Sequence, residues 1–436
     1  MNRYHRYQNV NSYWYDEVPD HWKKTKNKYV FHQDKKVVGS SWEDYVLLTM
    51  GKFGVKPRDM DGGGKFPASF ENYQVVTPNQ IIFCLFDIDE TPRTVGKSSD
   101  HGMITSAYDV FSTSTGNDPQ FWTYFYQMID DHKGLRPYYT GLRKVVRSET
   151  FMGIEVFSPP IEEQKLISRY LDKKTNQIDS LVEKIQKKIE LLKEQRTTLI
   201  NHFVTKGLDP NVEMKDSGVE WIGEIPKHWE VTRLKHISQV SLSSVDRHEH
   251  DDELKVSICH YPDVYKNEYI TTQTDLPSGT CSESEFLKFA LRDGDVLLTK
   301  DSESPDDIGI PTFVRGSLEN TVCGYHLGVI RSSSGKTHSN YLYRFIESKS
   351  AKDYFFTKSS GITRFGLGKG SIENLKIPLP PQDEQIEIAK KIDYISDKKS
   401  KISENLLVKI TLLKEYRQSL ISSVVTGKVR VTEDMI

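Results

Sequence analysis

Cysteine is scarce in this chain, and long apolar runs are missing from it. The few cysteines are scattered and form no C-x-x-C pair; they are Cys84, Cys259, Cys281 and Cys323. This pattern argues against a disulfide framework or a cysteine-rich zinc site and is typical of a reduced, cytoplasmic protein. No stretch of about 18 apolar residues occurs, and the opening MNRYHRYQNV lacks the apolar core of a secretion signal. We therefore expect a soluble protein without a membrane partner.

An excess of one charge is also missing. The 59 Lys and Arg residues nearly balance the 61 Asp and Glu residues, which leaves a formal net charge of −2. No global basic field therefore points to nucleic acid, and any binding of that kind must come from local patches.

Nucleotide and metal motifs are absent or weak. No G-x-x-x-x-G-K-[ST] sequence occurs, so ATP-driven translocation is not expected in this chain. The triplet His248-Glu249-His250 has neither spaced cysteines nor an H-E-x-x-H helix around it, so we predict no metal site.

The chain does have length and enough apolar residues to form cores. Its 436 residues suit two or three domains. A hydrophobic content of 36% with 11% aromatic residues argues against a disordered protein.

An internal repeat organises the chain. PPIEEQKLISRYLDKK begins at Pro159 and PPQDEQIEIAKKIDYI begins at Pro380, while LLKEQRTTLI (191–200) matches LLKEYRQSLI (412–421), both at an offset of 221 residues. A looser match joins EVPDHW (17–22) to EIPKHW (224–229). We infer a tandem duplication in which a variable segment precedes a long charged segment twice. The predicted boundaries are 1–158, 159–209, 210–379 and 380–436.

The double prolines mark helix starts. Ser158-Pro159-Pro160-Ile161 is close to the catalytic tetrapeptide of amino-methyltransferases, but the second copy reads Leu379-Pro380-Pro381-Gln382. The chain also lacks a glycine-rich strand–turn–helix of the kind that holds S-adenosylmethionine. Proline is favoured where a chain enters a helix, so we predict no catalytic residue here and a helix after each Pro-Pro.

Both charged segments have the apolar repeat of a coiled coil. Leucine or isoleucine recurs every seven positions, and further apolar residues, among them Leu181 and Ile402, fill the stripe between these positions. The predicted seam consists of Leu171, Ile178, Ile185, Leu192 and Leu199 in the first copy and of Ile392, Leu406, Leu413 and Leu420 in the second. Lys399 interrupts the second ladder. Each segment has about 44 residues without Gly or Pro, which corresponds to about 65 Å of helix.

Such a helix cannot bury its apolar stripe alone. The simplest partner is the other copy, and the two helices would then run antiparallel with one variable domain near each end. The alternative is that each helix packs on a different protein or forms a homodimer.

The variable segments look like mixed α/β domains, which makes the whole chain α+β. The runs 74–86, 295–300 and 327–333 are β-like, whereas FWTYFYQMI (121–129) and YLYRFIES (341–348) are helix-like. ITSAYDVFS (104–112) also matches GYHLGVIRS (324–332), so both domains are expected to share one fold.

Basic residues gather at equivalent places in the two repeats. Residues 132–148 hold five Lys or Arg side chains and no acid, and residues 313–376 hold ten Lys or Arg against four acids. Residues 282–307, by contrast, hold eight carboxylates against three cations. Arginine in a polar loop suits guanine readout or phosphate clamping. A solvated surface remains the alternative for any single arginine, while the two matched clusters favour nucleic acid.

These segments resemble a known family. PLPPQDEQIEIAKKID with LLKEYRQSLISSVVTGKV, their first copies, the leader GEIPKHWEVTRLKHI and the runs GDVLLTK and LGVIR are similar to the specificity (S) subunits of Type I restriction–modification systems. The resemblance covers almost the whole chain and is strongest in the long segments.

The resemblance implies a division of labour in host defence. Two target recognition domains, separated by the antiparallel coiled-coil pair as a pseudo-twofold tandem repeat, would each read half of a split double-stranded DNA target. Two methylation subunits would methylate adenine at N6, and restriction (motor–nuclease) subunits would join for cleavage. This chain would be non-catalytic, with S-adenosylmethionine, ATP and Mg²⁺ used by its partners.

The resemblance also points to DNA-contacting residues. GLRKVVR (141–147) resembles the family's glycine–arginine loop, and GITRFGLGKG (361–370) is its counterpart. The predicted DNA-binding residues are Arg136, Arg143, Lys144 and Arg147 in the first domain and Lys336, Arg364 and Lys369 in the second. Three alternatives stay open: an orphan DNA-binding regulator or decoy of the same fold, a coiled-coil scaffold that binds proteins, and a single-chain methyltransferase.

Overall fold

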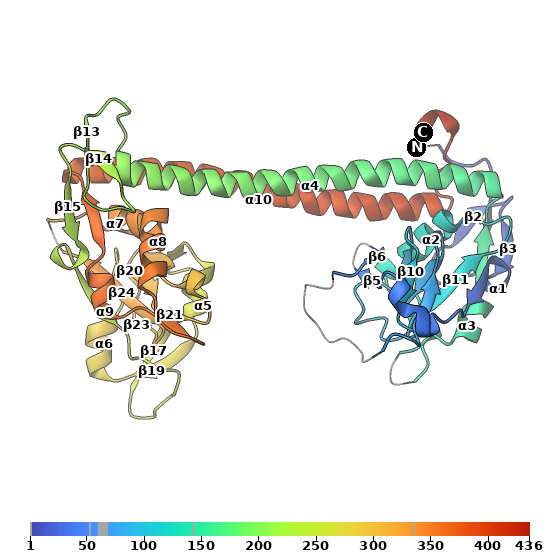
Figure 1. Cartoon of the computed structure of the whole chain (residues 1–436), viewed down its shortest axis with the longest axis horizontal. Coiled ribbons are helices and arrows are strands. Elements are labelled where there is room, and N and C mark those ends of the chain that lie inside the picture. Colours follow the sequence, from blue (N-terminus) through green and yellow to red (C-terminus); the bar gives the residue numbers. More distant parts are fainter. Residues whose placement is uncertain (1, 52–53, 60–68, 142–143, 334) are drawn as a thin grey trace. The chain divides into compact units, whose positions relative to one another are not determined.

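The computed structural model describes residues 2–51, 54–59, 69–141, 144–333 and 335–436, and it divides into two compact units (Figure 1). Unit 1 comprises Met1–Ile185 with Leu407–Ile436, and unit 2 comprises Gln186–Leu406. Each unit therefore combines one variable segment with part of both charged segments. No helix among the described residues is long and apolar enough to cross a membrane.

Each charged segment forms one long helix that begins directly after its Pro-Pro pair, as predicted. Helix α4 spans Ile161–Lys206, and helix α10 spans Gln382–Val425. The side chain of Gln164 in the first turn of α4 donates to the Ser158 hydroxyl at 3.1 Å and to the Pro159 carbonyl at 2.9 Å. Ser158 therefore helps to complete a helix start.

The two long helices run antiparallel in both units (Figure 1). In unit 1, Arg417 Nε donates to Asp179 Oδ1 at 3.0 Å. In unit 2, Arg196 Nε donates to Ser396 Oγ at 3.1 Å. Pairing within the chain is thus confirmed, and the alternative that each helix packs only on another molecule is not what the structure contains.

The nine predicted seam residues are all buried or half-buried. The prediction was wrong for Leu181 and Ile402, whose side chains are 47% and 36% exposed. Val182, rather than Leu181, packs against the core of unit 1. An α-helix drifts by about 20° per heptad against a strict seven-residue repeat, which moves the contact line from one residue to the next.

The sheets of unit 1 are antiparallel. The central sheet has the order β4-β11-β8-β9, and β3 pairs with β12 beside the start of α4. The strands of unit 1 are β1 Tyr7–Asn9, β2 Glu17–Pro19, β3 Lys23–Lys26, β4 Phe31–Asp34, β5 Leu48–Gly51, β6 Gly54–Pro57, β7 Gln74–Val76, β8 Ile81–Phe83, β9 Val95–Lys97, β10 Gly102–Ile104, β11 Asp109–Thr113 and β12 Glu155–Ser158. Its shorter helices are α1 Asn27–Val30, α2 Pro119–Asp131 and α3 Ser148–Gly153.

Unit 2 has a central sheet with the order β16-β24-β20-β22-β18, and β15 pairs with β26 beside the start of α10. Its strands are β13 Met214–Asp216, β14 Glu224–Pro226, β15 Glu230–Arg233, β16 Ser238–Leu242, β17 Leu254–Cys259, β18 Tyr269–Ile270, β19 Ser278–Cys281, β20 Val296–Thr299, β21 Asp301–Ser302, β22 Pro311–Val314, β23 Thr321–Cys323, β24 Leu327–Ser332, β25 Phe365–Gly366 and β26 Lys376–Leu379. Its shorter helices are α5 Tyr261–Lys266, α6 Glu283–Phe289, α7 Ser339–Glu347, α8 Lys349–Lys358 and α9 Lys369–Glu373.

The two central sheets share one strand order. β4, β11, β8 and β9 of unit 1 correspond to β16, β24, β20 and β22 of unit 2, which adds β18 at its edge. The predicted match between 104–112 and 324–332 falls on β11 and β24. The expectation of one fold for both domains is thus confirmed for the central sheet.

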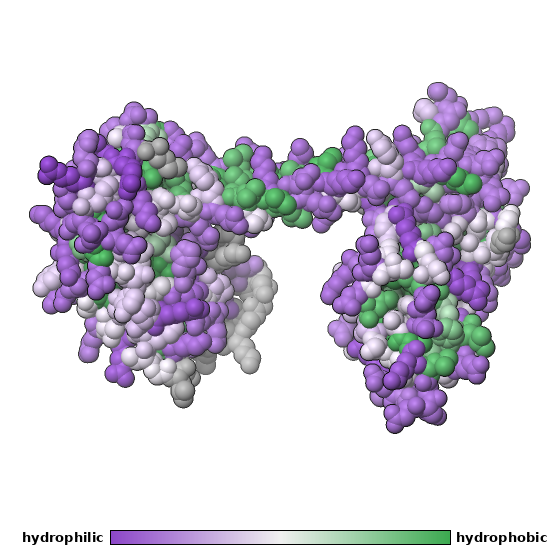
Figure 2. Space-filling view, turned by 180° about the vertical axis from the view of Figure 1, so that it is seen from behind, coloured by the Kyte–Doolittle hydropathy of each residue, from purple (hydrophilic) through white to green (hydrophobic). Residues whose placement is uncertain are grey.

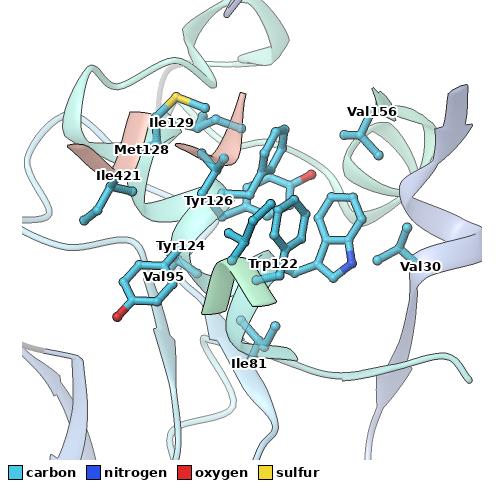
Figure 3. Close-up of a cluster of buried hydrophobic side chains, with 14 of the residues drawn as sticks. Val30, Ile81, Val95, Trp122, Tyr124, Tyr126, Met128, Ile129, Val156 and Ile421 are labelled. Atoms are coloured by element: carbon cyan, nitrogen blue, oxygen red, sulfur yellow. The ribbon is translucent and has the colours of Figure 1, made fainter. Parts of the chain in front are cut away.

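Helix α2 supplies much of the core of unit 1. Its start is capped by the Asp118 carboxylate, which accepts a bond from the Phe121 amide at 2.9 Å. Trp122 is fully buried, and Figure 3 shows it beside Tyr126 and Val30. Ile421 of α10 lies in the same cluster, so the long helix is part of this domain's core (Figure 3).

The repeated His-Trp dipeptide holds the first turn of each long helix. In unit 1, Trp22 Nε1 donates to Glu163 Oε1 at 3.0 Å, and His21 Nε2 lies 2.8 Å from Glu163 Oε2. The same contacts, at 3.0 and 2.9 Å, recur in unit 2 between Trp229, His228 and Glu384. A carboxylate is favourable at a helix N-terminus because of the helix dipole. The segments 17–22 and 224–229 thus attach the first turn of each long helix to its own unit.

A glycine ends each long helix in the left-handed region, Gly207 with a φ of 78° and Gly427 with a φ of 75°. A Cβ at Gly207 would lie 3.2 Å from Glu384 Oε1, at the end of a side chain. A Cβ at Gly427 would lie 2.3 Å from the Pro19 ring. The two sites therefore share the backbone strain and differ in steric room.

We expect Gly427→Ala to destabilise the protein more than Gly207→Ala. Both variants pay about 1–2 kcal/mol for a side chain in the left-handed region. Gly427→Ala adds the displacement of Pro19, which costs about 1–3 kcal/mol for an overpacked site. Calorimetric unfolding of both variants checks this order, and equal shifts in Tm would contradict it.

A buried ionic network attaches the sheet of unit 2 to both long helices. Arg344 of α7 is fully buried, and its guanidinium lies 2.8 Å from Glu268, 2.7 Å from Glu347 and 2.6 Å from Asp393 of α10. Arg196 of α4 contacts Glu347 at 2.5 Å and Glu268 at 2.8 Å. Every charge in this cluster therefore has a partner of opposite sign, which is the condition under which buried ions are tolerated.

Candidate nucleic-acid interface

Each unit presents a loop at the same place in its repeat, residues 140–147 in unit 1 and 360–368 in unit 2. The Val146 amide donates to the Leu85 carbonyl at 2.8 Å, and the Leu367 amide donates to the Lys300 carbonyl at 2.7 Å. Val146 and Leu367 are 221 residues apart in the sequence, which is the offset of the repeat. Both loops are therefore anchored by a buried apolar residue next to the end of the equivalent strand, β8 or β20.

A short bridge closes each loop ahead of that anchor. Thr140 pairs with Val145, and Ser360 pairs with Gly366. Each bridge ties together the two ends of its loop, and loops carried on a sheet are common places for binding residues.

Two of the four predicted basic residues of unit 1, Arg136 and Lys144, contact one carboxylate, that of Asp89. Arg136 Nε lies 3.0 Å from Asp89 Oδ1, and Lys144 Nζ lies 3.1 Å from Oδ2. The Tyr139 hydroxyl donates to the same carboxylate at 3.0 Å. Hydrogen bonds from Arg136, and then from Lys144 and Tyr139, lower the pKa of Asp89 to about 2. The carboxylate is therefore charged at neutral pH.

The other two predicted residues of unit 1 lie beside this cluster in sequence. Arg147 directly follows the Val146 anchor and is exposed at the start of α3. Arg143 lies outside the described residues.

Unit 2 repeats the arrangement with different residues. Arg364 Nη2 lies 3.0 Å from Asp301 Oδ1 and 3.1 Å from His326 Nδ1. His326 Nδ1 is also 2.7 Å from Asp301 Oδ1. Lys300 Nζ lies 4.5 Å from the centre of the half-exposed Tyr325 ring, and burial lowers the pKa of Lys300. Cations and an aromatic face meet here at one surface.

Two predicted residues stand apart from Arg364. Lys369 starts α9, just after the loop, with its Nζ 3.5 Å from Glu373. Lys336 donates to the His236 carbonyl at 3.1 Å and follows the opposite end of β24 from His326. A strand of that length spans about 20 Å. The structure therefore does not bring Lys336 together with the loop.

Sequence reasoning missed the carboxylates Asp89 and Asp301. Residues 282–307 read as an acid-rich stretch, and only the fold places one of its members under a basic loop. The sequence did contain a signal for these two carboxylates, because each of them lies a few residues after the end of a strongly β-like run.

No group of three or more His, Cys, Asp or Glu side chains is placed to hold a metal among the described residues. His248, part of the triplet weighed above, pairs instead with Asp246 at 3.2 Å.

The fold and the site define a tandem-repeat protein in which each mixed domain presents a closed basic loop and leads into a long helix. The family described as Type I restriction modification DNA specificity domain matches residues 226–412. The chain is 25% identical over 293 residues to the Type I restriction enzyme MjaVIII specificity subunit of Methanocaldococcus jannaschii, covering 66% of this chain and 64% of that protein. It is 24% identical over 292 residues to the EcoKI specificity subunit of Escherichia coli, covering 65% of this chain and 59% of that protein.

Solved structures agree on the fold. A chain from a study of complex assembly and conformational transition of the type I R-M system aligns with a TM-score of 0.70 at 12% identity, covering 94% of this chain and 99% of that one. The HsdS subunit from Thermoanaerobacter tengcongensis aligns with a TM-score of 0.51 at 12% identity, covering 94% and 98%.

Residues 226–412 thus match the Type I restriction modification DNA specificity domain, and about two thirds of the chain is similar to proteins named Type I restriction enzyme specificity subunits. It spans about three fifths of the length of the curated relatives that it matches.

Proposed function

We propose that this chain is the DNA sequence-recognition subunit of a Type I restriction–modification complex and that it reads a bipartite, asymmetric target. The observation that carries the proposal is the loop that occurs in both units, closed by a short bridge, anchored beside β8 or β20, with Lys144 in the first loop and Arg364 in the second. The cations differ between the two loops, which suits two different half-sites. Base edges in the major groove are read by such side chains, and phosphates are bound by them.

We infer that the long helices bind two methylation subunits. In unit 1, Val408, Leu412 and Tyr416 of α10 are 59%, 58% and 48% exposed. Their spacing of four residues places them on one face of the helix, and Figure 2 shows apolar surface along the helix pair. An exposed apolar stripe on an otherwise charged helix is typical of an interaction surface.

In this proposal the chain itself is non-catalytic and acts in the cytoplasm. Adenine methylation at N6 is carried out by the methylation subunits with S-adenosylmethionine. Motor–nuclease subunits, which use ATP and Mg²⁺, join the complex for restriction.

We expect Arg364→Ala to weaken binding to the selected target by about 1–3 kcal/mol and to relax one position of the half-site read by unit 2. A residue that contacts only phosphate would instead weaken all sequences alike. Selection from a random duplex library, followed by titration of the selected sequence, measures both effects. Lys349→Ala on α8 is the matched control, since its cation pairs with Asp353 away from the loop.

The same library separates the alternatives. Selection of a split sequence without methylation by any partner would favour an orphan regulator or decoy. If random-sequence competitor DNA abolished binding, or if the chain bound no DNA at all, the protein-binding scaffold would be favoured. Cofactor binding by the isolated chain would favour a single-chain methyltransferase.

A further inference from the structure

Both candidate loops lie over a carboxylate that is less exposed than the cations it holds. The Asp89 side chain is 21% exposed, whereas those of Arg136 and Lys144 are 63% and 44% exposed. The Asp301 side chain is 19% exposed, and that of Arg364 is 57% exposed. In each unit the carboxylate therefore lies beneath the basic side chains and leaves them facing solvent.

A carboxylate in such a place acts against simple attraction to DNA. It reduces the net positive charge of the loop, and non-specific affinity depends on the number of cations free to neutralise phosphates. It also holds long, flexible side chains in one orientation, which lowers the ordering cost when they meet a partner of matching geometry. The loop therefore loses net positive charge, and its basic side chains gain a defined orientation.

We propose that Asp89 and Asp301 are positioning residues for sequence discrimination, because each holds basic side chains in or beside its loop for base contacts and withholds them from random phosphates. This inference rests on the proposed DNA-recognition function and deepens it. The two units then share one arrangement although their loops differ in sequence. Asp89 is contacted by three side chains, and Asp301 is contacted by Arg364 and His326.

The test uses the full-length variants Asp89→Asn and Asp301→Asn, which preserve side-chain shape and remove the charge. Two controls also remove a carboxylate charge that pairs with a lysine, but away from the loops. They are Glu155→Gln, paired with Lys24 at 2.8 Å, and Asp353→Asn, paired with Lys349 at 2.7 Å. Binding to the selected duplex and to a random-sequence duplex is titrated across a range of salt concentrations.

We expect the loop variants to bind random duplex about 3-fold more tightly for each cation released, with a salt slope steeper by about 0.9 per cation. Binding to the selected duplex should stay the same or weaken, so that the ratio of specific to random affinity falls at least by that factor. The control variants should leave this ratio unchanged. Calorimetric unfolding of all four variants checks that each one folds.

Two results would overturn the inference alone. Equal changes in the loop and control variants would mean that only total charge matters. An unchanged salt slope, with lost binding confined to one cytosine position, would mean that the carboxylate accepts a bond from the base itself. A wild-type chain that does not distinguish the selected from the random duplex would overturn the proposed function, and this inference with it.

Discussion

Replacing Arg344 with alanine is expected to destabilise unit 2 by about 3–5 kcal/mol, because three partly buried carboxylates lose the buried cation that they share. Glu268, Glu347 and Asp393 all contact the Arg344 guanidinium, and Arg196 can reach only the first two of them. Asp393 of α10 would keep only the contact from Arg315 at 3.1 Å and the bond from the Asn340 amide. Calorimetric or denaturant unfolding of the variant measures the loss.

The matched control for Arg344→Ala is Lys349→Ala, which removes an exposed partner at 2.7 Å from Asp353. Exposed pairs contribute about 0–1 kcal/mol, so this variant should unfold close to the wild type. A loss below about 1 kcal/mol for Arg344→Ala would contradict the account of a tightly satisfied buried network.

Acidification offers a second measure of the same network. Burial acts to raise the pKa of Glu268, but the charges of Arg196 and Arg344 outweigh it and lower the pKa below 4.5. A lowered carboxyl pKa contributes stability that is present above the unfolded value and is lost as the pH falls through the folded value. The difference in stability between wild type and Arg344→Ala should therefore shrink below pH 4.5.

Trp229→Ala is the second large effect that we expect, at about 3–5 kcal/mol for a fully buried tryptophan. Trp229 packs in the core of unit 2 and donates to Glu384 in the first turn of α10. Its loss removes packing and weakens the attachment of the leader to the helix start. Unfolding monitored by calorimetry measures the change.

Trp229→Phe separates the two contributions of this side chain. It keeps most of the packing and removes the bond to a charged carboxylate, which is worth about 1.5–3 kcal/mol. Trp22→Phe makes the same change in unit 1, at the equivalent bond to Glu163. Similar losses in both variants would support one shared function of the His-Trp dipeptide, whereas no loss in either would contradict it.

The long helices could be predicted from sequence because their signal is local and repeated. The Pro-Pro pairs before Ile161 and Gln382 mark the first turns, and the apolar period is sustained over many turns. The error at Leu181 has a physical cause, since a seven-residue template is only an approximation to the α-helical period. Lys399, which breaks the ladder, donates to Gln195 of α4 at 2.5 Å.

The candidate site was less predictable because it depends on contacts between distant residues. Arg364 was expected in a basic loop, but its partners Asp301 and His326 come from elsewhere in the chain. In the sequence, Asp301 is one of eight Asp or Glu residues along 282–307, and the count of charges does not distinguish it from the others. Only the pairing of strands shows that this carboxylate lies under the loop.

The most direct test of the account is to map methylated adenines in genomic DNA treated with the purified chain and its methylation subunit. We expect N6-methyladenine at a split motif with two specific halves, and only when this chain is present. Arg364→Ala should relax one half of that motif and leave the other unchanged. Methylation at the same sites without the chain, or at a motif that is not split, would contradict the central claim.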